Sequence, residues 1–224
     1  MKLNEMYDDE YFKERYFNDP KRMISFMNEK KFIAEYHDFT GTICDVGCST
    51  GEFLKAIEWK GPKYGMEINE NAIKAAQYNG ISFEKNIITE KEFFDIVVFR
   101  GTIQHLINPF EYIELAYKSL KPGGLIFILA TPNINSIFYK FFNTLPALDP
   151  NKNFFLPSDI QLIQILSIFS FETLEIQKPY LNSPYSNFFM DHVKFISRLV
   201  VGLKRFNKSF PFWGNMMNVV AKKL

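Results

Sequence analysis

The sequence predicts an α/β protein built on a doubly wound, mostly parallel sheet of seven strands. Three observations support this prediction. From Gly41 onward, short apolar runs alternate with amphipathic helical stretches. The first run ends in a glycine-containing turn that leads into a helix, and residues 95–99 are rich in β-branched side chains. Strands and helices that alternate at this spacing form a parallel sheet covered by helices on both faces.

The expected strands are short apolar or alternating segments. They comprise residues 42–46, 63–68, 81–84, 95–99, 125–130, 171–177 and 215–221. The expected helices have apolar residues at helical spacing and recognisable ends. They comprise residues 51–59, 70–78 and 109–120, a helix that Ser158 opens as N-cap, and residues 188–206. Pro109 suits a first helical turn, and Lys121-Pro122-Gly123-Gly124 is a stop signal.

Two regions fall outside this alternation. Residues 5–38 have apolar side chains at helical spacing, interrupted at Pro20, so we expect helices there. Residues 134–157 contain five phenylalanines and three prolines. This segment is too long for a plain connection in such a fold. The sequence therefore predicts a helical, Phe-rich cap beside the sheet.

Composition and charge limit the possible functions. The chain has 224 residues and a formal net charge of +1, so it has no global positive field to hold a nucleic-acid backbone. We therefore expect no nucleic-acid partner. The longest clean apolar run, residues 125–130, is far too short to cross a bilayer. Cys44 and Cys48 flank one turn and are expected to be buried thiols, which favours a reducing, cytoplasmic location.

The segment with the most chemical information follows the first strand. Asp45 closes that strand, Gly47 and Gly51 permit a tight turn, and a helix begins directly afterwards. Ligands of open parallel sheets bind at this carboxyl edge. Glu67 follows Gly47 by twenty residues and closes the second strand. A carboxylate there is suited to accept both hydroxyl groups of a ribose.

The turn does not favour a ligand with phosphates. A dinucleotide fingerprint requires glycine where this chain has Ser49 and Glu52, and no Gly-Lys-Ser/Thr sequence of a P-loop follows. Glu52 would also compete with a pyrophosphate for the positive end of the helix. S-adenosylmethionine has a ribose, an ammonium and a carboxylate but no phosphate. We expect Asp45 to bind its ammonium and backbone N–H groups around Gly47 to bind its carboxylate.

These residues belong to a larger pattern between about Gly41 and Pro132. It consists of Asp45-Val46-Gly47-Cys48-Ser49-Thr50-Gly51, Gly65-Met66-Glu67-Ile68, Phe94-Asp95-Ile96-Val97-Val98 and Leu120-Lys121-Pro122-Gly123-Gly124-Leu125. The four segments, in this order and spacing, resemble class I S-adenosylmethionine-dependent methyltransferases, which have a Rossmann-like fold. The resemblance implies S-adenosylmethionine as cofactor. It implies a cofactor-binding set of Asp45, Gly47, Cys48, Gly51, Phe53, Glu67, Ile68, Asn86, Ile87 and Arg100.

The resemblance also places residues 100–106 beside the transferred methyl group. His105 is the candidate general base, because neutral imidazole titrates near pH 7. In its other interpretation, His105 only orders the loop by hydrogen bonds. Gln104 departs from the Glu-His pair that relatives acting on hydroxyls often have. Arg100 either binds an anionic acceptor or forms an ion pair that holds the loop, and it replaces the carboxylate that metal-using relatives need, so we expect no metal.

Further acceptor-site candidates lie outside these segments. With Gln104, the predicted substrate-binding set comprises Tyr11, Asn133, Tyr185 and His192. Tyr11 belongs to an aromatic N-terminal stretch, and the last two lie between the final two strands. We expect residues 1–40 to be a helical lid, residues 41–133 the cofactor-binding core, and residues 134–224 the substrate cap and the last strands.

Residues 188–206 form a basic amphipathic pattern that includes Lys194, Arg198, Lys204 and Arg205. Such a helix has two interpretations. It can lie on an anionic membrane, or it can pack its apolar face on the domain as part of the cap. We expect the second, because it is the commoner arrangement.

The predicted reaction is transfer of a methyl group from S-adenosylmethionine to a small molecule, at a hydroxyl group. The bias toward Lys, Asn, Ile and Phe is typical of an AT-rich bacterial genome, in which similar enzymes often serve polysaccharide pathways. This analogy favours a sugar, a nucleotide-sugar or a phosphorylated sugar precursor of a surface polysaccharide. The alternatives are a quinone or lipid-like acceptor at the membrane surface, and a non-catalytic cofactor-binding module. The oligomeric state stays open.

Overall fold

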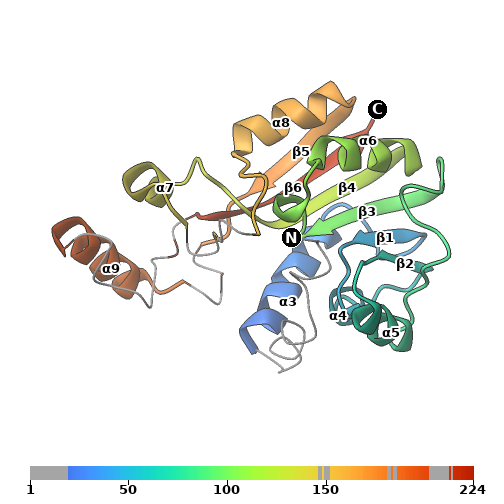
Figure 1. The fold of residues 1–224 in the computed structure, drawn as a ribbon, viewed down its shortest axis with the longest axis horizontal. Coiled ribbons are helices and arrows are strands. Elements are labelled where there is room, and N and C mark those ends of the chain that lie inside the picture. The colour runs from blue at the N-terminus through green and yellow to red at the C-terminus, as the bar shows by residue number, and fades with distance from the viewer. Residues whose placement is uncertain are drawn as a thin grey trace.

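The computed structural model describes residues 20–145, 148, 152–180, 183, 186–201, 212 and 214–224. A six-stranded sheet with the order β2-β1-β3-β4-β6-β5 forms its centre (Figure 1). The strands are β1 (Ile43–Val46), β2 (Lys63–Met66), β3 (Phe94–Arg100), β4 (Leu120–Pro132), β5 (Phe171–Gln177) and β6 (Met216–Lys223). Strands β1 to β4 pair in parallel, whereas β6 is antiparallel to both β4 and β5. The predicted α/β class with a mostly parallel sheet is confirmed.

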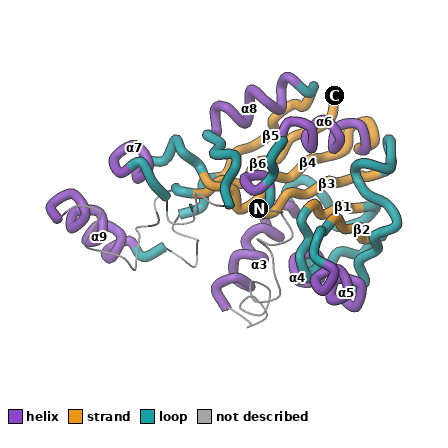
Figure 2. The backbone as a smooth tube through the Cα atoms, viewed as in Figure 1, coloured by secondary structure: helices purple, strands orange, loops and turns teal. Residues whose placement is uncertain are grey.

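Helices lie on both faces of this sheet (Figures 1 and 2). They are α3 (Pro20–Ala34), α4 (Glu52–Ala56), α5 (Glu70–Tyr78), α6 (Pro109–Ser119), α7 (Ile137–Phe142), α8 (Asp159–Ile168) and α9 (Phe188–Val201), with a 3-10 helix, η1 (Ile103–His105). Helices α3, α4 and α5 cover one face, and α6 and α8 cover the other (Figure 1).

Two hydrophobic clusters fill the space between the sheet and its helices. Along β3, Ile96 and Val98 pack with the residues of α3 and α4. Val97 and Phe99, which point the opposite way, pack with α6 and α8. A parallel strand covered on both faces needs apolar residues at every position, because successive side chains point to opposite faces. This is why residues 95–99 read as a continuous apolar run.

Residues 81–84 do not form a strand, contrary to the prediction, and the sheet has six strands rather than seven. Ser82 forms a single bridge to Tyr64 of β2. Its N–H donates to the carbonyl oxygen of Lys63, and its own carbonyl accepts from Gly65, both at 2.9 Å. Its hydroxyl then accepts from the N–H of Glu84 at 3.3 Å. The chain therefore turns after one pair.

The predicted stop signal after α6 begins a strand instead of a free turn. α6 ends at Ser119 and β4 starts at Leu120. Pairing with β3 continues only at Leu125, so the residues between form an irregularity in the ladder in which Gly123 adopts a φ of 74°. The predicted helix end is confirmed to within one residue, whereas the strand begins earlier than predicted.

The ends of several other helices and strands agree closely with the prediction. The helix expected at residues 70–78 and the strand expected at residues 171–177 have these bounds in the structure. Ser158 caps α8 as predicted. Its hydroxyl accepts from the N–H of Gln161, and the Gln161 side chain accepts from the N–H of Ser158, both at 3.1 Å. This reciprocal pair satisfies two donors at the start of the helix.

Helices α7 and α9 lie together at one end of the molecule, away from the sheet (Figure 1). The ring of Phe195 on α9 packs edge-on against Phe141 and Phe142 of α7, with centroids 5.4 and 5.5 Å apart. The expectation that α9 packs its apolar face on the domain is wrong, because Phe189 and Val200 are 73% and 79% exposed. Among the described residues, no helix is long and apolar enough to cross a membrane.

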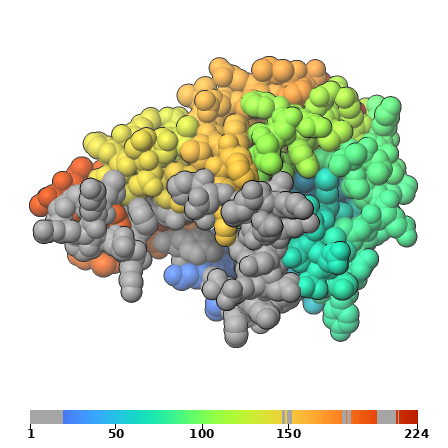
Figure 3. Space-filling model, in the orientation of Figure 1, coloured from blue at the N-terminus to red at the C-terminus, as the bar shows by residue number. Residues whose placement is uncertain are grey.

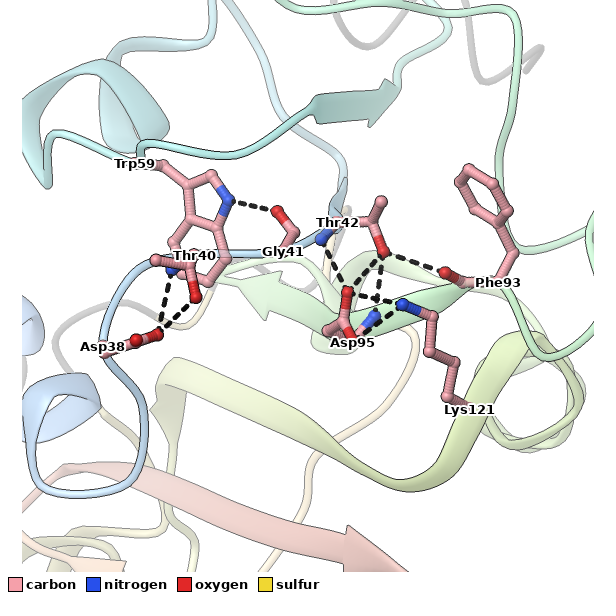
Figure 4. A network of polar contacts seen from close by, with 8 residues as sticks. All are labelled: Asp38, Thr40, Gly41, Thr42, Trp59, Phe93, Asp95 and Lys121. Carbon is pink, nitrogen blue, oxygen red and sulfur yellow. Dashed lines mark hydrogen bonds and ion pairs between the residues drawn. The ribbon is translucent and has the colours of Figure 1, made fainter.

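At the amino edge of the sheet, the carboxylate of Asp95 joins three strands (Figure 4). It accepts from the N–H and the hydroxyl of Thr42, just before β1, at 2.7 and 2.8 Å. It also accepts from Lys121 of β4 at 2.8 Å. Burial alone would raise the pKa of Asp95, but the hydrogen bonds from Lys121 and Thr42 outweigh it and hold the pKa below its usual range. The charged carboxylate therefore stabilises the fold.

Asp95→Ala is expected to lower the free energy of unfolding by about 1–3 kcal/mol, because it removes a charge-assisted hydrogen bond and the acceptor of the Thr42 N–H. The folded pKa is depressed. Wild type therefore has this contribution above the unfolded pKa of about 4 and loses it as the pH falls through the folded pKa. Urea unfolding of both proteins at neutral and acidic pH measures this. An equal difference at both pH values would contradict the electrostatic explanation.

Candidate functional site

The carboxyl ends of β1 and β3 bring two loops into contact. Gly47 follows β1 and has a φ of 76°, a left-handed conformation that favours glycine. A Cβ atom at Gly47 would lie 2.5 Å from Oγ1 of Thr102, in the loop that follows β3. The hydroxyl of Thr102 in turn donates to the carbonyl of Arg100 at 3.2 Å. Glycine at 47 is therefore required by both the turn and its neighbour.

Asp45 lies at this edge and is only 2% exposed. Its Oδ1 has no hydrogen-bond partner among the described residues. Burial is the largest cause that raises the pKa of Asp45 to about 7, with Glu67 and Glu29 adding to it and Arg100 opposing it. A buried carboxylate in this state is stabilised by a cation that brings its own hydrogen-bond donors.

At this edge of the sheet, two more buried polar atoms have no hydrogen-bond partner among the described residues. They are Oγ of Ser49, in the turn after β1, and Oε1 of Gln104, in η1 after β3. Buried polar groups in folded proteins are normally paired, so three such atoms at one edge of a sheet need an explanation. Polar groups of a ligand supply one.

The carboxylate of Glu67 makes hydrogen bonds within the chain that the sequence did not reveal. Its Oε2 accepts from the N–H of Ser49 at 3.0 Å, and its Oε1 accepts from the N–H groups of Ile68 and Asn69 at 2.7 and 3.1 Å. The carboxylate thus ties the turn after β1 to the end of β2. It retains lone pairs for a ribose, although both oxygens are engaged.

The expected carboxylate-binding N–H groups around Gly47 are also partly engaged. The N–H groups of Gly47 and Cys48 donate to the carbonyl of Met66 at 2.7 and 3.2 Å. These two bonds close the turn onto β2. A carboxylate at this turn therefore has to use other donors, and the unpartnered hydroxyl of Ser49 is available.

Arg100 forms an ion pair, the second of its two predicted interpretations. Its Nε and one terminal nitrogen donate to the two carboxylate oxygens of Glu29 on α3 at 2.5 and 3.1 Å. The guanidinium also lies 4.3 Å from the ring centre of Phe26 and 5.5 Å from that of Phe53. Burial raises the pKa of Glu29 even though Arg100 lies beside it. The pair fixes α3 on the end of β3.

Several of the predicted cofactor-binding residues are buried in the structure. Phe53 and Ile87 are buried in the two hydrophobic clusters. Cys48 is 4% exposed, and burial raises the pKa of its thiol well above the usual value. Gly51 caps the start of α4 with a φ of 75°. Among the described residues, no group of three or more metal-ligating side chains comes together.

Two predicted adenine neighbours, Ile68 and Asn86, differ in whether their side chains are engaged within the chain. Ile68 is 46% exposed at the end of β2 and can cover a ligand. Asn86 instead uses its side-chain oxygen in its own turn, accepting from the N–H groups of Ile88 and Thr89 at 2.9 and 3.3 Å. Its predicted contact to an adenine amine would have to replace these bonds.

His105 is held by hydrogen bonds on both ring nitrogens. Nδ1 lies 2.7 Å from the carbonyl oxygen of Lys152, so it carries the proton. Nε2 is then an acceptor, and the side-chain amide of Gln104 lies 3.3 Å from it. The main-chain carbonyl of Gln104 also accepts from the N–H groups of Phe154 and Phe155 at 2.9 and 3.2 Å. The Phe-rich cap segment therefore packs directly on this loop.

Two of the other predicted acceptor residues, Asn133 and His192, make hydrogen bonds within their own parts of the fold. Asn133 is 1% exposed, and its side-chain oxygen accepts from the N–H groups of Asn135 and Asp159, which makes it a structural cap. His192 lies on α9, where Nδ1 contacts the carbonyl of Phe188 at 2.7 Å. Tyr11 and Tyr185 lie outside the described residues.

A small cavity of about 40 Å³ adjoins the Glu29–Arg100 pair. It lies between α3 and the carboxyl edge of β4, β5 and the start of β6. Its polar lining consists of Ser25, Asn28, Glu29, Gln177, Ser183 and Asn218. The described lining residues include no Lys, Arg or His. A neutral, hydroxyl-bearing group suits such a lining better than an anion does.

Sequence reasoning missed Glu29, Ser49 and Thr102 as site residues. Glu29 had a signal, since it shares the buried stripe of α3 with Phe26 and Ile33, where a charged side chain needs a partner. Ser49 and Thr102 lie inside segments that the sequence did indicate, but nothing singled them out there, because their contacts join distant loops.

The residues present fit S-adenosylmethionine. Asp45 offers a buried carboxylate for the ammonium, Glu67 lies at the end of β2 for the ribose, and Ser49 offers a hydroxyl. No part of this set requires a phosphate.

Comparison with known proteins agrees with this arrangement. The sequence model of a family described as "Methyltransferase domain" matches residues 12–199. The ubiquinone biosynthesis O-methyltransferase of Hydrogenovibrio crunogenus is 29% identical over 110 residues, which cover 43% of this chain and 46% of that protein. The chain thus spans about half the length of the curated relatives it matches.

Solved structures show the same fold. An S-adenosylmethionine-dependent methyltransferase from Archaeoglobus fulgidus superposes with a TM-score of 0.67 at 19% identity, over 96% of this chain and 100% of that one. Magnesium protoporphyrin IX methyltransferase from Synechocystis, with bound S-adenosylhomocysteine, superposes with a TM-score of 0.65 at 11% identity, over 99% and 98% of the two chains. The fold is therefore that of S-adenosylmethionine-dependent methyltransferases.

Arg100→Met is expected to destabilise the protein by about 3–5 kcal/mol, because it leaves the buried Glu29 carboxylate without its cation. Adding Glu29→Gln is expected to recover most of the loss. The exposed pair Lys118–Glu114 provides a matched control, and Lys118→Met there is expected to cost less than about 1 kcal/mol. Urea unfolding compares the variants. Similar losses for Arg100→Met and Lys118→Met would show that the buried pair has no special role.

Proposed function

The chain belongs to the methyltransferase domain family, and we propose that it transfers the methyl group of S-adenosylmethionine to a hydroxyl group of a small molecule. The observation that carries this proposal is the buried Asp45 carboxylate, whose Oδ1 has no partner in the described part of the chain. An ammonium group supplies the missing charge and donors. The position at the carboxyl end of β1 is where ligands of such sheets bind.

The chain's main contribution is to position the two reactants. When bound, S-adenosylmethionine supplies a methyl group on a positively charged sulfur, which a nucleophile attacks in line. Asp45 holds the ammonium end, and Glu67 and Ile68 hold and cover the nucleoside end. The loop with Thr102 and Gln104 then faces the space between cofactor and acceptor. Orientation of this kind accounts for much of the rate of a displacement reaction.

His105 is the proposed proton acceptor for the hydroxyl. Its contact with the Lys152 carbonyl fixes the tautomer, so Nε2 carries the lone pair that a general base uses. The Gln104 amide that approaches Nε2 at 3.3 Å has to give way to the acceptor hydroxyl. The competing interpretation, that His105 only anchors the cap segment, uses the same Lys152 contact.

We propose a polyhydroxylated acceptor such as a sugar, which need not carry a phosphate. The cavity beside α3, with a volume of about 40 Å³, is too small for a whole sugar, but its described lining of amide, hydroxyl and carboxylate groups without a cation suits a hydroxyl-bearing part of one. An anionic acceptor would there face Glu29 with no compensating charge other than Arg100, which Glu29 already engages. This reasoning favours a neutral sugar over the phosphorylated precursor within the predicted class.

A quinone or lipid-like acceptor is the second candidate. Two observations favour it: the exposed apolar face of α9, and the relatives named as ubiquinone biosynthesis O-methyltransferases at 29–30% identity. Formation of S-adenosylhomocysteine with methyl glycosides, or instead with catechols that carry an isoprenoid tail, distinguishes the two candidates. Cofactor binding without turnover on any hydroxyl compound would favour the non-catalytic module.

Asp45→Asn is expected to have opposite effects on stability and on cofactor binding. Because burial raises the pKa of Asp45 to about 7, the folded state binds this proton more tightly than the unfolded one. Wild type therefore loses stability as the pH rises from about 4 to 7, and no further above. At a pH of about 8, the variant without ligand is expected to be about 1–3 kcal/mol more stable than wild type.

The same variant is expected to bind S-adenosylmethionine at least ~10-fold more weakly, since it lacks the charge for the ammonium. Wild-type affinity should rise through a pH of about 7 and level off near 8, where the cofactor's own amino group begins to lose its proton. Calorimetry over this range, with urea unfolding in parallel, measures both effects. A variant with unchanged affinity would refute the ammonium role.

His105→Ala is expected to lower kcat by at least ~10²-fold, the low end for a general base, while the Kd of S-adenosylmethionine stays unchanged. The pH profile of kcat should also lose its lower limb. Steady-state rates with the identified acceptor test this. His105→Asn keeps a donor for the Lys152 carbonyl, so recovery of the rate by Asn would assign His105 to loop anchoring instead.

A further inference from the structure

Helix α9 exposes apolar side chains along most of its length. Seven of its fourteen residues are large apolar side chains that are at least 43% exposed. They are Phe188, Phe189, Met190, Val193, Ile196, Leu199 and Val200. Single exposed apolar residues are normal on a protein surface, but a contiguous set of this kind marks an interaction site.

These residues form one face of the helix. At about 100° per residue, they occupy an arc of roughly 200°. The opposite arc contains Asp191 and Arg198, which are 0% and 2% exposed. The helix is therefore inverted, with its charged residues inward and its apolar residues outward. A helix on a water-facing surface has the reverse arrangement.

Polar contacts hold α9 in this orientation. Oδ2 of Asp191 accepts from the N–H of Asn187 at 2.9 Å, and Oδ1 accepts from the N–H of Phe212 at 3.1 Å. The ring of Phe195 packs on α7. Rotating the helix to bury its apolar face would break the contacts of the buried Asp191, and an unpaired buried charge is costly. The apolar face is thus fixed outward.

Helix α7 extends the exposed apolar surface. Ile137 and Phe141 are 54% and 62% exposed, and Figure 3 shows α7 and α9 side by side at one end of the molecule. The combined surface lies at the end of the molecule farthest from β2 and α5 (Figure 1).

The charge of the sequence around α9 indicates which partner fits. Residues 188–211 contain Lys194, Arg198, Lys204, Arg205 and Lys208, with Asp191 as the one acidic residue, for a net charge of +4. The whole chain has +1, so the remainder has −3. Arg198 is buried, so the charges that a negatively charged surface can attract are Lys194 and the three basic residues that follow the helix in the sequence. The rest of the protein, with its net negative charge, is repelled by such a surface. A second copy of the chain would bring like charges together.

We propose that α9 is an interfacial helix that places its outward apolar face in the headgroup region of an anionic membrane. An anionic bilayer supplies both an apolar layer for the exposed side chains and negative charge for the basic segment. The proposal holds for either class of methyl acceptor. It does not require the chain to cross the membrane.

Vesicle flotation tests the proposal on the full-length protein. Wild type is expected to float with vesicles of phosphatidylcholine mixed with phosphatidylglycerol. It should float much less with phosphatidylcholine alone or at high salt, which screens the attraction. The variant Val193→Ser/Ile196→Ser/Val200→Ser should partition at least ~100-fold more weakly, because each apolar side chain contributes a factor of about ten or more.

Helix α8 offers a matched control, since Ile160, Ile163 and Ile168 are 57%, 40% and 76% exposed. Ile160→Ser/Ile163→Ser/Ile168→Ser is expected to float like wild type. Circular dichroism and calorimetry with S-adenosylmethionine establish that both variants are folded. Failure of wild type itself to bind this cofactor would speak against the proposed function and leave the membrane proposal standing.

Three results would overturn the proposal. The first is wild type that stays at the bottom of the gradient with anionic vesicles. The second is equal flotation of the α9 variant and wild type. The third is a wild-type dimer in light scattering that the α9 substitutions convert to a monomer, which would assign the face to contact between copies of the chain.

Discussion

The site depends on a carboxylate held where the protein alone does not satisfy it. Asp45 lies in the middle of the parallel sheet, between β2 and β3, and the register of both neighbours fixes its backbone. The side chain has no freedom to reach solvent, and its Oδ1 has no partner among the described residues. The charged form of Asp45 is therefore unfavourable in the protein alone, and a cationic ligand would stabilise it. Around this carboxylate lie Glu67, Ser49 and Arg100.

The opposite edge of the sheet shows the same residue type under the opposite condition. Asp95 lies in β3 and receives the Thr42 N–H and the Lys121 ammonium, which hold its pKa low. Among the described residues, Oδ1 of Asp45 receives no such donor, and burial holds the pKa of Asp45 high. At one edge an aspartate therefore stabilises the fold, whereas at the other edge a buried aspartate destabilises it in the proposed cofactor site. Substitutions at the two positions are therefore expected to have opposite effects on stability.

The sequence was sufficient for the features that depend on local order. Apolar runs identify the buried strands, and the spacing from Asp45 to Glu67 identifies the carboxyl ends of the neighbouring strands β1 and β2. It was insufficient where the outcome depends on tertiary contacts. The pairing of Arg100 with Glu29 joins residues 71 positions apart, and the periodicity of α9 defines its faces without saying which one points outward. That choice rests on bonds from Asp191 to a distant segment.

Close packing of Thr102 against Gly47 couples the loop after β3 to the loop after β1. Thr102 occupies the space that a methyl group at position 47 would need, and its carbonyl oxygen accepts from the N–H of His105 at 2.8 Å. The distance between the loop after β1, where the cofactor is proposed to bind, and the loop after β3, which holds His105, therefore depends on residue 47 having no Cβ atom. A larger side chain at position 47 would displace Thr102, and with it the backbone that positions the imidazole of His105.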